Sequence, residues 1–290
     1  MKSTLFKSIV SISLGLMLIT FAVSCKKNGP PTGGLTTTTP TTTPTTTTTT
    51  TTVTPSLDTT KYSMIWSDEF SGTAVDTTKW NFETGNLNVN NEEEYYKASN
   101  ATVANGNLVI TAKREQNGNQ LYTSSRMNTL GKVSAQYGLI EARIKIPLGA
   151  GLWPAFWMMG TDITNVSWPN CGEIDIMEHI NATNTFYGTM HWNSGGGAVQ
   201  YGLTTTITNP DNYHIYAVAW DQNSINWYID GVLYVTGNIA NNINNTGAFQ
   251  KPFFILLNMA VGGDFPGQYV DTSVLPASMY VDYVRVYKAK

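Results

Sequence analysis

Residues 173–178 read Glu-Ile-Asp-Ile-Met-Glu, three carboxylates alternating with large apolar side chains. Successive side chains of a strand point to opposite faces, so Glu173 and Asp175 share one face and the two isoleucines share the other. Strict alternation would put Glu178 on the isoleucine face, but a β-bulge at Met177 adds one residue and returns Glu178 to the acidic face. The stretch therefore predicts a strand that packs its apolar face on a core and carries three acids on the other.

Three clustered acids are unfavourable for stability, because like charges raise one another's pKa and disfavour folding. A lone Glu-x-Asp pair is common on solvated strands, yet the isoleucine face indicates that this strand is packed. Two carboxylates with unequal pKa values are what hydrolysis of a glycosidic bond requires. Aromatic rings offer flat apolar faces on which sugars stack, although some fill ordinary core positions. Four tryptophans lie near the motif: Trp153, Trp157, Trp168 and Trp192.

Short alternating segments recur along the rest of the chain. The dipeptide Asp230-Gly231 favours a tight hairpin turn within residues 225–235. No segment sustains a helical period over three turns. Many short strands separated by Asn and Gly turns predict an all-β sandwich. The other strand candidates are 139–146, 213–220, 253–258 and 279–287.

The first residues read as an export signal rather than as part of the fold. Lys2 and Lys7 precede an apolar run over residues 9–23, which is too short and wrongly flanked for a spanning helix. Ala22-Val23-Ser24-Cys25 resembles a bacterial lipobox, in which the cysteine becomes the lipidated N-terminus. We expect a signal peptide over residues 1–24 and a lipid on Cys25 that holds the exported protein on a bacterial membrane, at the cell surface or facing the periplasm. Plain secretion is the alternative.

The composition of the remaining chain indicates a linker followed by one domain and limits its possible partners. Residues 25–61 are dominated by threonine and proline and have too few apolar side chains to bury, so we expect a disordered linker. Residues 62–290 are long enough for one large domain. The formal net charge of −3 and the lack of a basic patch argue against nucleic acid and favour a neutral polysaccharide over a sulfated one. With Cys25 lipidated, Cys171 has no disulfide partner, and we expect it to be a small buried apolar residue.

The segment GEIDIMEH, residues 172–179, resembles the active-site signature of glycoside hydrolase family 16 in its laminarinase-like branch. The resemblance extends from about Tyr62 to Tyr287, with the branch's segments in the same order. It implies a jelly roll of two curved antiparallel sheets, whose concave sheet forms an open substrate cleft. The further matching segments are NNEEEYY (90–96), SSRMNTLGK (124–132), YGLIEARIKIPLGAGLWPAFWMMG (137–160), GTMHW (188–192), INWYIDG (225–231), LNMAVGGDFPG (257–267) and MYVDYVRVY (279–287).

The resemblance implies a role for each acid. Glu173 is the expected nucleophile, and Glu178 is the expected acid that protonates the leaving oxygen and then the base that activates water. Asp175 lies between them and would restrain Glu173 through a hydrogen bond. The two reactive carboxyl groups should lie about 5–5.5 Å apart, the separation of retaining enzymes. No cofactor is expected for catalysis.

Other positions follow from the same resemblance. The expected substrate-binding residues are Asn90, Arg126, Trp153, Trp157, Trp168 and His191. His179 and His214 are expected to be structural. A structural calcium site, held largely through backbone oxygens, would involve Glu69, Gly106 and Asp282, although carbonyl ligation leaves almost no side-chain signature. Asp264 and Phe265 stand where the branch usually has Asn and Trp, which leaves the linkage preference open.

The sequence thus predicts a monomeric, membrane-anchored, endo-acting enzyme that cleaves β-1,3-glucan of the laminarin type, with mixed β-1,3/1,4-glucan as an additional substrate. An enzyme specific for mixed-linkage glucan, or for a galactan such as agarose, is the alternative within the family. A glycan-binding jelly roll without activity is the alternative from another class, but a binder gains nothing from three clustered acids. The balance between hydrolysis and transglycosylation stays open.

Overall fold

The computed structural model describes residues 56–290. The predicted signal peptide, Cys25 and most of the predicted linker lie outside the described residues. The described part starts before Tyr62, the predicted first residue of the domain. Ser56 forms a β-bridge with Val232, and the Leu57 amide donates to the Gly231 carbonyl. The residues just before Tyr62 are therefore attached to the domain.

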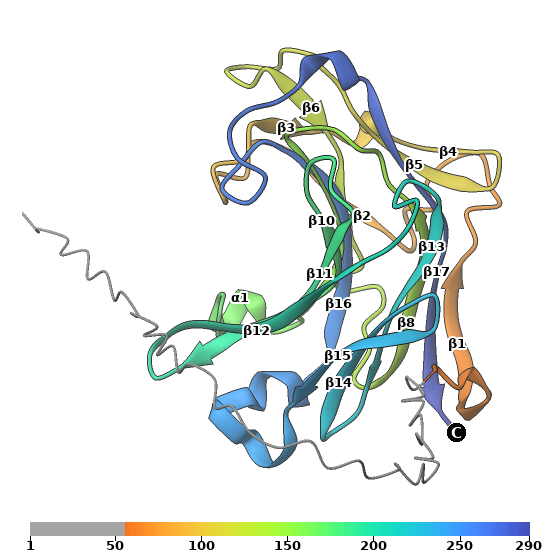
Figure 1. The fold of residues 1–290 in the computed structure, drawn as a ribbon, viewed down its shortest axis with the longest axis vertical. Helices are drawn as coiled ribbons and strands as arrows, with labels where there is room; N and C mark the ends of the chain where they lie inside the picture. The colour runs from red at the N-terminus through yellow and green to blue at the C-terminus, as the bar shows by residue number, and fades with distance from the viewer. Residues whose placement is uncertain (1–55) are drawn as a thin grey trace, which may run out of the picture. The chain divides into compact units, whose positions relative to one another are not determined.

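Nearly all regular structure in residues 56–290 is β-strand, arranged in two large antiparallel sheets (Figure 1). The first sheet runs in the order β15 (Val232–Asn238), β14 (Ser224–Ile229), β13 (Tyr213–Trp220), β8 (Gly138–Lys145), β17 (Ala277–Ala289), β5 (Asn107–Ala112), β4 (Ala101–Ala104), with β1 (Tyr62–Asp68) also pairing with β17. The second runs in the order β12 (Gly197–Thr206), β11 (Thr185–Ser194), β10 (Glu173–His179), β9 (Leu152–Gly160), β16 (Phe253–Val261), β7 (Arg126–Asn128), β2 (Asn81–Glu83).

Short elements complete the described chain. Strands β3 (Glu94–Tyr96) and β6 (Tyr122–Ser124) form a parallel pair. The helical segments are η1 (Thr59–Lys61), η2 (Ala98–Asn100), α1 (Ile163–Val166), η3 (Ala240–Gln250) and η4 (Thr272–Val274). Within residues 56–290, no helix is long and apolar enough to cross a membrane.

The two sheets pack face to face around the core, and the predicted jelly-roll sandwich is confirmed (Figure 1). The alternation predicted for β8 places Ile140, Ala142 and Ile144 in the core with no exposed surface. The predicted hairpin joins β14 to β15 through Asp230 and Gly231, whose φ angles of 51° and 78° are both left-handed. This geometry is typical of a type I′ turn, which matches the twist of paired strands.

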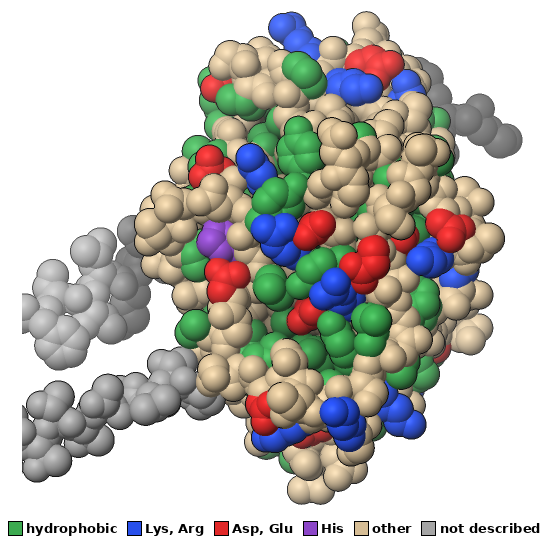
Figure 2. All heavy atoms as spheres, turned by 90° about the vertical axis from the view of Figure 1, so that its right-hand side faces the viewer, with side chains coloured by type: hydrophobic (Ala, Val, Ile, Leu, Met, Phe, Trp, Pro, Cys, Tyr) green, Lys and Arg blue, Asp and Glu red, His purple; other side chains and the backbone are tan. Residues whose placement is uncertain are grey.

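The outer face of the first sheet carries acidic and basic side chains interspersed with hydrophobic ones (Figure 2). Arg143 pairs with Asp282, and Arg285 pairs with Glu69. Acidic and basic side chains alternate over this face. It therefore offers no basic patch.

Candidate active site

The acidic strand β10 contains the predicted bulge. Asp175 pairs with Trp157 of β9, but the next pairs are Met177 with Phe156 and Glu178 with Ala155, so the register shifts by one residue. The shift recurs against β11. Ile176 and Met177 follow one another in sequence, yet both are fully buried in the core. The extra residue is thus confirmed, and Glu178 returns to the same face as Glu173 and Asp175.

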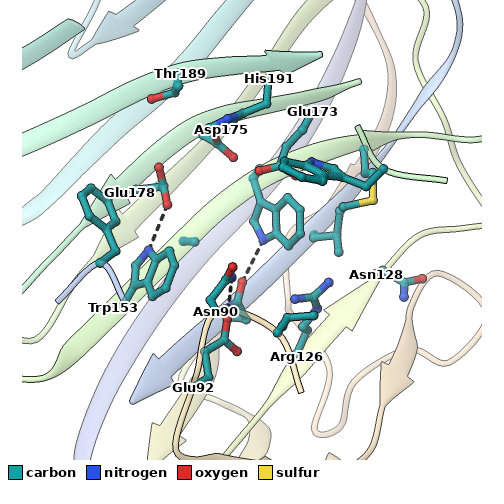
Figure 3. Close-up of a pocket in the computed structure, with 18 of the residues that line it drawn as sticks. Asn90, Glu92, Arg126, Asn128, Trp153, Glu173, Asp175, Glu178, Thr189 and His191 are labelled. Carbon is teal, nitrogen blue, oxygen red and sulfur yellow. Dashed lines mark hydrogen bonds and ion pairs between the residues drawn. The ribbon is translucent and has the colours of Figure 1, made fainter. Parts of the chain in front are cut away.

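That face lines a cleft of about 990 Å³ on the concave sheet (Figure 3). The lining crosses the whole sheet, from Gln200 on β12 to Glu83 on β2. The structure brings together all three acids and all six residues that the sequence assigns to substrate binding. These residues are Glu173, Asp175, Glu178, Asn90, Arg126, Trp153, Trp157, Trp168 and His191.

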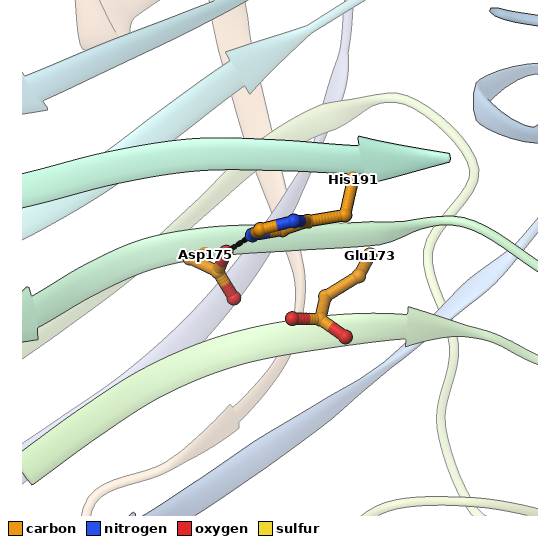
Figure 4. A group of neighbouring side chains, drawn as sticks. All are labelled: Glu173, Asp175 and His191. Carbon is orange, nitrogen blue, oxygen red and sulfur yellow. Dashed lines mark ion pairs between the residues drawn. The ribbon is translucent and has the colours of Figure 1, made fainter. Parts of the chain in front are cut away.

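Asp175 lies at the centre of the acidic cluster and is 3% exposed. Its Oδ2 atom lies 3.0 Å from Nε2 of His191, which projects from the neighbouring strand β11 (Figure 4). One side-chain atom each of Glu173, Asp175 and His191 lies within 4.8 Å of the others. Asp175 is therefore held between the histidine and Glu173, where it restrains both.

Glu178 is fixed by a residue of the adjacent strand β9. The indole Nε1 of Trp153 donates a hydrogen bond of 2.9 Å to Oε1 of Glu178 (Figure 3). The second oxygen, Oε2, has no such donor from Trp153 and is left for the cleft. Trp153 therefore orients one carboxyl group of the cluster.

The surroundings raise the pKa of all three acids of the cluster. Burial, followed by the charge of Asp175, raises the pKa of Glu173 to about 8, against the influence of His191. Burial also raises the pKa of Asp175 to about 7, although its hydrogen bond with Glu173 opposes the rise. Burial, and then the charges of Asp175 and Glu173, raise the pKa of Glu178 well above its ordinary value. Since two negative neighbours act on Glu178, it is the carboxyl most strongly favoured to hold a proton.

An aromatic group lies beside Glu178. The rings of Trp153 and Phe265 meet edge to face at 5.4 Å, and those of Tyr187 and Phe265 at 4.8 Å. Phe265 is 37% exposed. The smaller ring at position 265 is therefore part of the cleft wall, as the departure from the family pattern anticipated.

A chain of hydrogen bonds joins the cleft floor to its rim. Trp157 Nε1 donates to Oδ1 of Asn258, and the Asn258 amide donates to the Tyr96 hydroxyl. Tyr96 donates in turn to Oε2 of Glu92, whose Oε1 accepts from the Asn90 amide. Asn90 is therefore oriented by contacts that begin at a buried tryptophan.

Arg126 covers the other side of Trp157. Its guanidinium lies 4.7 Å from the ring centroid, in a cation–π arrangement. Arg126 Nε also lies 2.9 Å from Glu83, and Glu83 accepts from the Asn128 amide. The arginine charge is thus largely balanced within the cleft.

The four tryptophans near the motif differ in burial. Trp168 is 46% exposed, with its ring 6.5 Å from that of His191. Trp157 is 8% exposed, and Trp192 is a core residue whose Nε1 donates to the Asn244 carbonyl. Trp168 therefore presents its ring to the cleft most openly.

Residues expected to be structural lie away from the cleft surface. His179 is fully buried, contacts the Thr183 carbonyl through Nε2 and packs against Phe186. His214 pairs with Asp230 at the hairpin turn. Cys171 is fully buried, and burial raises the pKa of its thiol to about 11, so a thiolate is disfavoured.

Of the three residues expected at the calcium site, the two acids, Glu69 and Asp282, form ion pairs with arginines. Both carboxylate oxygens of Glu69 accept from Arg285, and Oδ2 of Asp282 accepts from Arg143. Gly106 lies in the turn between β4 and β5. Calcium prefers six to eight oxygen ligands, and these carboxylates do not fit a calcium cluster because each faces a guanidinium. Any calcium here would depend on backbone oxygens, so the site stays a prediction.

Several cleft residues were not predicted. Tyr187 and Thr189 line the cleft on the same strand as His191. Alternation along β11 would have found both once His191 was assigned to the cleft. Phe254, Leu256 and Asn258 line the cleft from β16, but every residue of this strand is buried. The one polar residue of the strand, Asn258, was the available signal, since alternation from it places Leu256 and Phe254 on the same face.

Comparison with known proteins gives a consistent result. The profile of glycosyl hydrolases family 16 matches residues 87–285. The clotting factor G alpha subunit of Tachypleus tridentatus is 44% identical over 79% of this chain and 34% of its own length. Glucan endo-1,3-beta-glucosidase A1 of Niallia circulans is 38% identical over 78% of this chain and 38% of its own length. This chain thus spans little more than a third of the length of these two relatives.

A solved structure matches over a fuller range. The laminarinase catalytic domain from Thermotoga maritima MSB8 is 42% identical, with a TM-score of 0.73. The match covers 79% of this chain and 99% of that domain. The described residues therefore correspond to a complete catalytic domain of that relative.

Proposed function

The chain belongs to glycosyl hydrolase family 16, and we propose that it is a retaining endo-β-1,3-glucanase that also cuts mixed β-1,3/1,4-glucan. The observation that carries this proposal is the gathering of Glu173, Asp175 and Glu178 on the floor of one cleft. The Niallia relative is named for endo-1,3-β-glucosidase activity and the Thermotoga relative is a laminarinase. Both names support the same substrate class.

In the proposed first step, the Glu173 carboxylate attacks the anomeric carbon of the sugar. The bond to the glycosidic oxygen breaks, and Glu178 gives its proton to that oxygen. A covalent glycosyl-enzyme intermediate and a shortened glucan result. In the second step, Glu178 takes a proton from water, the water oxygen attacks the anomeric carbon, and Glu173 leaves as a carboxylate.

Protonation of Glu178 at the start is supported by its surroundings. Burial and the neighbouring charges raise its pKa well above the ordinary value. The Trp153 indole donates to Oε1, which leaves Oε2 to carry the proton toward the leaving group. An oriented carboxyl group whose pKa is raised toward the operating pH is an efficient general acid.

His191 limits the rise in the pKa of Glu173, the proposed nucleophile, which burial and Asp175 together raise to about 8. The side chain of Glu173 remains partly exposed to the cleft. Asp175 links the histidine to the nucleophile through its 3.0 Å contact with His191. We assign Asp175 the role of holding Glu173 in place and of keeping a negative charge near Glu178.

The cleft is suited to a polymer. It crosses seven strands, and six gaps of about 4.8 Å give a span of roughly 29 Å. Such a span holds several consecutive sugar rings, so cleavage inside a chain is expected. Exposed Trp168 and Phe265 offer apolar faces, and Asn90 and Arg126 offer hydrogen-bond donors. The balanced charge of Arg126 and the acids elsewhere favour a neutral glucan over a sulfated polymer.

The phenylalanine at position 265 is the feature that supports a second candidate substrate. Phe265 packs against Trp153, which donates to Glu178, the proposed donor of the proton to the leaving glucan. A change of ring at this position alters the contact with the leaving sugar, so a preference for mixed-linkage glucan or a galactan is the second candidate. A glycan-binding module without activity is disfavoured, because it would retain three costly acids without using them.

We also propose that the chain is exported, held on a membrane by a lipid on Cys25, and monomeric. The lipobox-like Ala22-Val23-Ser24-Cys25 and the threonine-rich stretch after it support the anchor. A tether of this composition would let the domain reach a polysaccharide away from the membrane. These residues lie outside the described part of the chain.

The substrate assignment is tested with the purified protein and four polymers. Laminarin, lichenan, agarose and carrageenan are incubated separately, and products are sized over time. The proposal expects rapid shortening of laminarin with a mixture of oligosaccharides from the start, slower cleavage of lichenan, and no cleavage of carrageenan. Release of a single small product from the outset would contradict endo action. Cleavage of agarose alone would contradict the glucanase assignment.

A further inference from the structure

The bulge in β10 is contacted from behind by a residue of the opposite sheet. Trp227 of β14 is fully buried in the core. Its indole Nε1 donates a hydrogen bond of 2.7 Å to the backbone carbonyl of Asp175. Asp175 is the last residue in regular register before the shift. The contact therefore lies where the strand departs from its ladder.

Two glycines make room for this indole. A Cβ atom at Gly188 would lie 2.7 Å from Cδ1 of Trp227 and 2.4 Å from the Tyr234 hydroxyl. At the other end of the ring, a Cβ atom at Gly237 would lie 3.3 Å from Cζ3 of Trp227 and 2.7 Å from the Met190 sulfur. Close approach rather than backbone conformation thus favours glycine at both positions, most strongly at Gly188, where the rigid indole is nearest. The ring is confined to one slot.

Gly188 also stands opposite the bulge. On β11, Thr189 pairs with Asp175 and Tyr187 pairs with Glu178, which leaves Gly188 between them without a partner on β10. Because Gly188 has no side chain, space is left on the core face of the acidic sheet at this position. Trp227 and Tyr234 occupy that space.

A second irregularity faces the first across the core. Trp227 pairs with Val235 of β15, whereas the next residue, Tyr228, pairs with Leu233. Tyr234 is therefore an extra residue on β15, and its hydroxyl lies close to Gly188. Burial, and then the charges of Glu178 and Asp175, raise the pKa of Tyr234, which agrees with this closeness. The irregularity of β15 in the first sheet thus lies against the bulge of β10 in the second.

We propose that Trp227 is a positioning residue for the acid strand, its N–H holding the Asp175 carbonyl and so fixing the direction in which Glu178 leaves the bulge. A bulge disrupts the ladder locally and bends the strand, so a buried carbonyl at its start needs a fixed donor. A misplacement of about 1 Å in a catalytic group costs roughly a hundredfold in rate. The inference rests on the proposed function, because it assigns Glu178 the role of acid.

The first test compares two tryptophan variants. Trp227→Phe removes the donor, and Trp220→Phe is the matched control. Trp220 lies on the neighbouring strand β13, is 2% exposed, and donates through Nε1 to the Phe249 carbonyl. We expect kcat on laminarin to fall at least ~10-fold in Trp227→Phe, with KM changed less than twofold. We expect kcat of Trp220→Phe to stay within twofold of the parent, despite a similar loss of thermal stability. Equal kcat values in the two variants would overturn the inference.

The second test separates the N–H group from the shape of the ring. Site-specific replacement of Trp227 by 3-benzothienylalanine keeps the bicyclic ring and puts sulfur in place of the N–H group. The inference expects the same loss of kcat as in Trp227→Phe but a smaller loss of thermal stability, because the packing of the ring is kept and only the hydrogen bond is lost. Parental kcat in this analogue would show that the ring acts by packing alone and would overturn the inference.

A structural readout keeps this inference distinct from the substrate assignment. If the parent cleaves none of the tested glycans, the proposed function fails, but crystal structures of the parent and of Trp227→Phe still decide the positioning role. The inference expects a rotated peptide after Asp175 and a displaced Glu178 carboxyl group in the variant. An unchanged Glu178 in the variant would overturn it.

Discussion

The indole Nε1 of Trp153 lies 2.9 Å from Oε1 of Glu178 and donates to it. The two side chains come from adjacent strands, β9 and β10, in which Ala155 is the direct partner of Glu178. Trp153 is thus the diagonal neighbour of Glu178, with its ring against Phe265. This single contact connects the wall of the cleft to the proposed proton donor.

Replacing Trp153 with Phe should alter the pH dependence as well as the rate. The Trp153 hydrogen bond lowers the pKa of Glu178, so its loss raises that pKa further. Because the proposed acid must be protonated, the alkaline limb of kcat/KM should move to higher pH. We also expect kcat to fall about tenfold, as for a typical general-acid contribution that is partly lost. An alkaline limb that moves to lower pH would contradict the role of this contact.

Replacing Asp175 with Asn should move the profile in the opposite direction. The charge of Asp175 raises the pKa of both Glu173 and Glu178. Its removal lowers both, so the acid limb and the alkaline limb of kcat/KM should shift to lower pH together. The measurement is a pH–rate profile for parent and variant at one ionic strength, since charge effects are screened by salt. A shift of only one limb would show that Asp175 acts on one glutamate alone.

Replacing either reactive glutamate with Gln should lower turnover by several orders of magnitude while laminarin binding persists. Gln keeps the shape but can neither attack nor exchange protons. Azide and an aryl glucoside with a good leaving group distinguish the two roles. In Glu178→Gln, azide should replace water and give a product of retained configuration. In Glu173→Gln, azide should replace the nucleophile and give the inverted product. The reverse pattern would exchange the two assignments.

The buried acids should make stability depend on pH. The pKa of Glu178 is raised in the folded state above the ordinary value of 4.5. Between these values the folded state binds more protons than the unfolded state, so the free energy of unfolding falls as pH rises. Glu178→Gln removes this loss of stability at high pH, because glutamine does not ionise. Its thermal midpoint should exceed that of the parent at about pH 8, and the difference should shrink by about pH 4, where both states of the parent are protonated. In a domain of this size, ~1 kcal/mol corresponds to about 2–4 °C.

Replacing Cys25 with Ser should release the protein from membranes. A lipid chain is an anchor that the serine side chain cannot replace on this route. Cell fractionation of parent and variant in the producing bacterium measures the effect, with catalytic activity of both fractions as the control. An unchanged membrane fraction of the variant would rule out the lipid anchor.

The acidic motif made the centre of the site predictable. Its period of two fixed the faces of Glu173 and Asp175, and the need to bring Glu178 to them required a bulge. The register shift after Asp175 bears this out. The hairpin turn at Asp230-Gly231 was equally predictable from the sequence, because that dipeptide readily adopts the left-handed φ angles found at both positions.

Contacts that depend on the pairing of distant segments were not predictable. The bond from Trp153 to Glu178 requires the register of β9 on β10, which the sequence of either strand leaves open. Strand β16 is buried on both faces and has one polar residue, Asn258, so Phe254 and Leu256 could be assigned to the cleft only by alternation from that residue. The position of Trp227 behind Asp175 depends on how the two sheets face each other, and no local pattern encodes that.

The most direct test of the proposed mechanism is NMR of the product that forms first from laminarin, recorded before mutarotation. Attack by Glu173 followed by attack of water inverts the anomeric carbon twice, so the new reducing end should appear as the β-anomer and equilibrate only later. An α-anomer as the first product would contradict the assignment of Glu173 as nucleophile and, with it, the double displacement by Glu173 and Glu178.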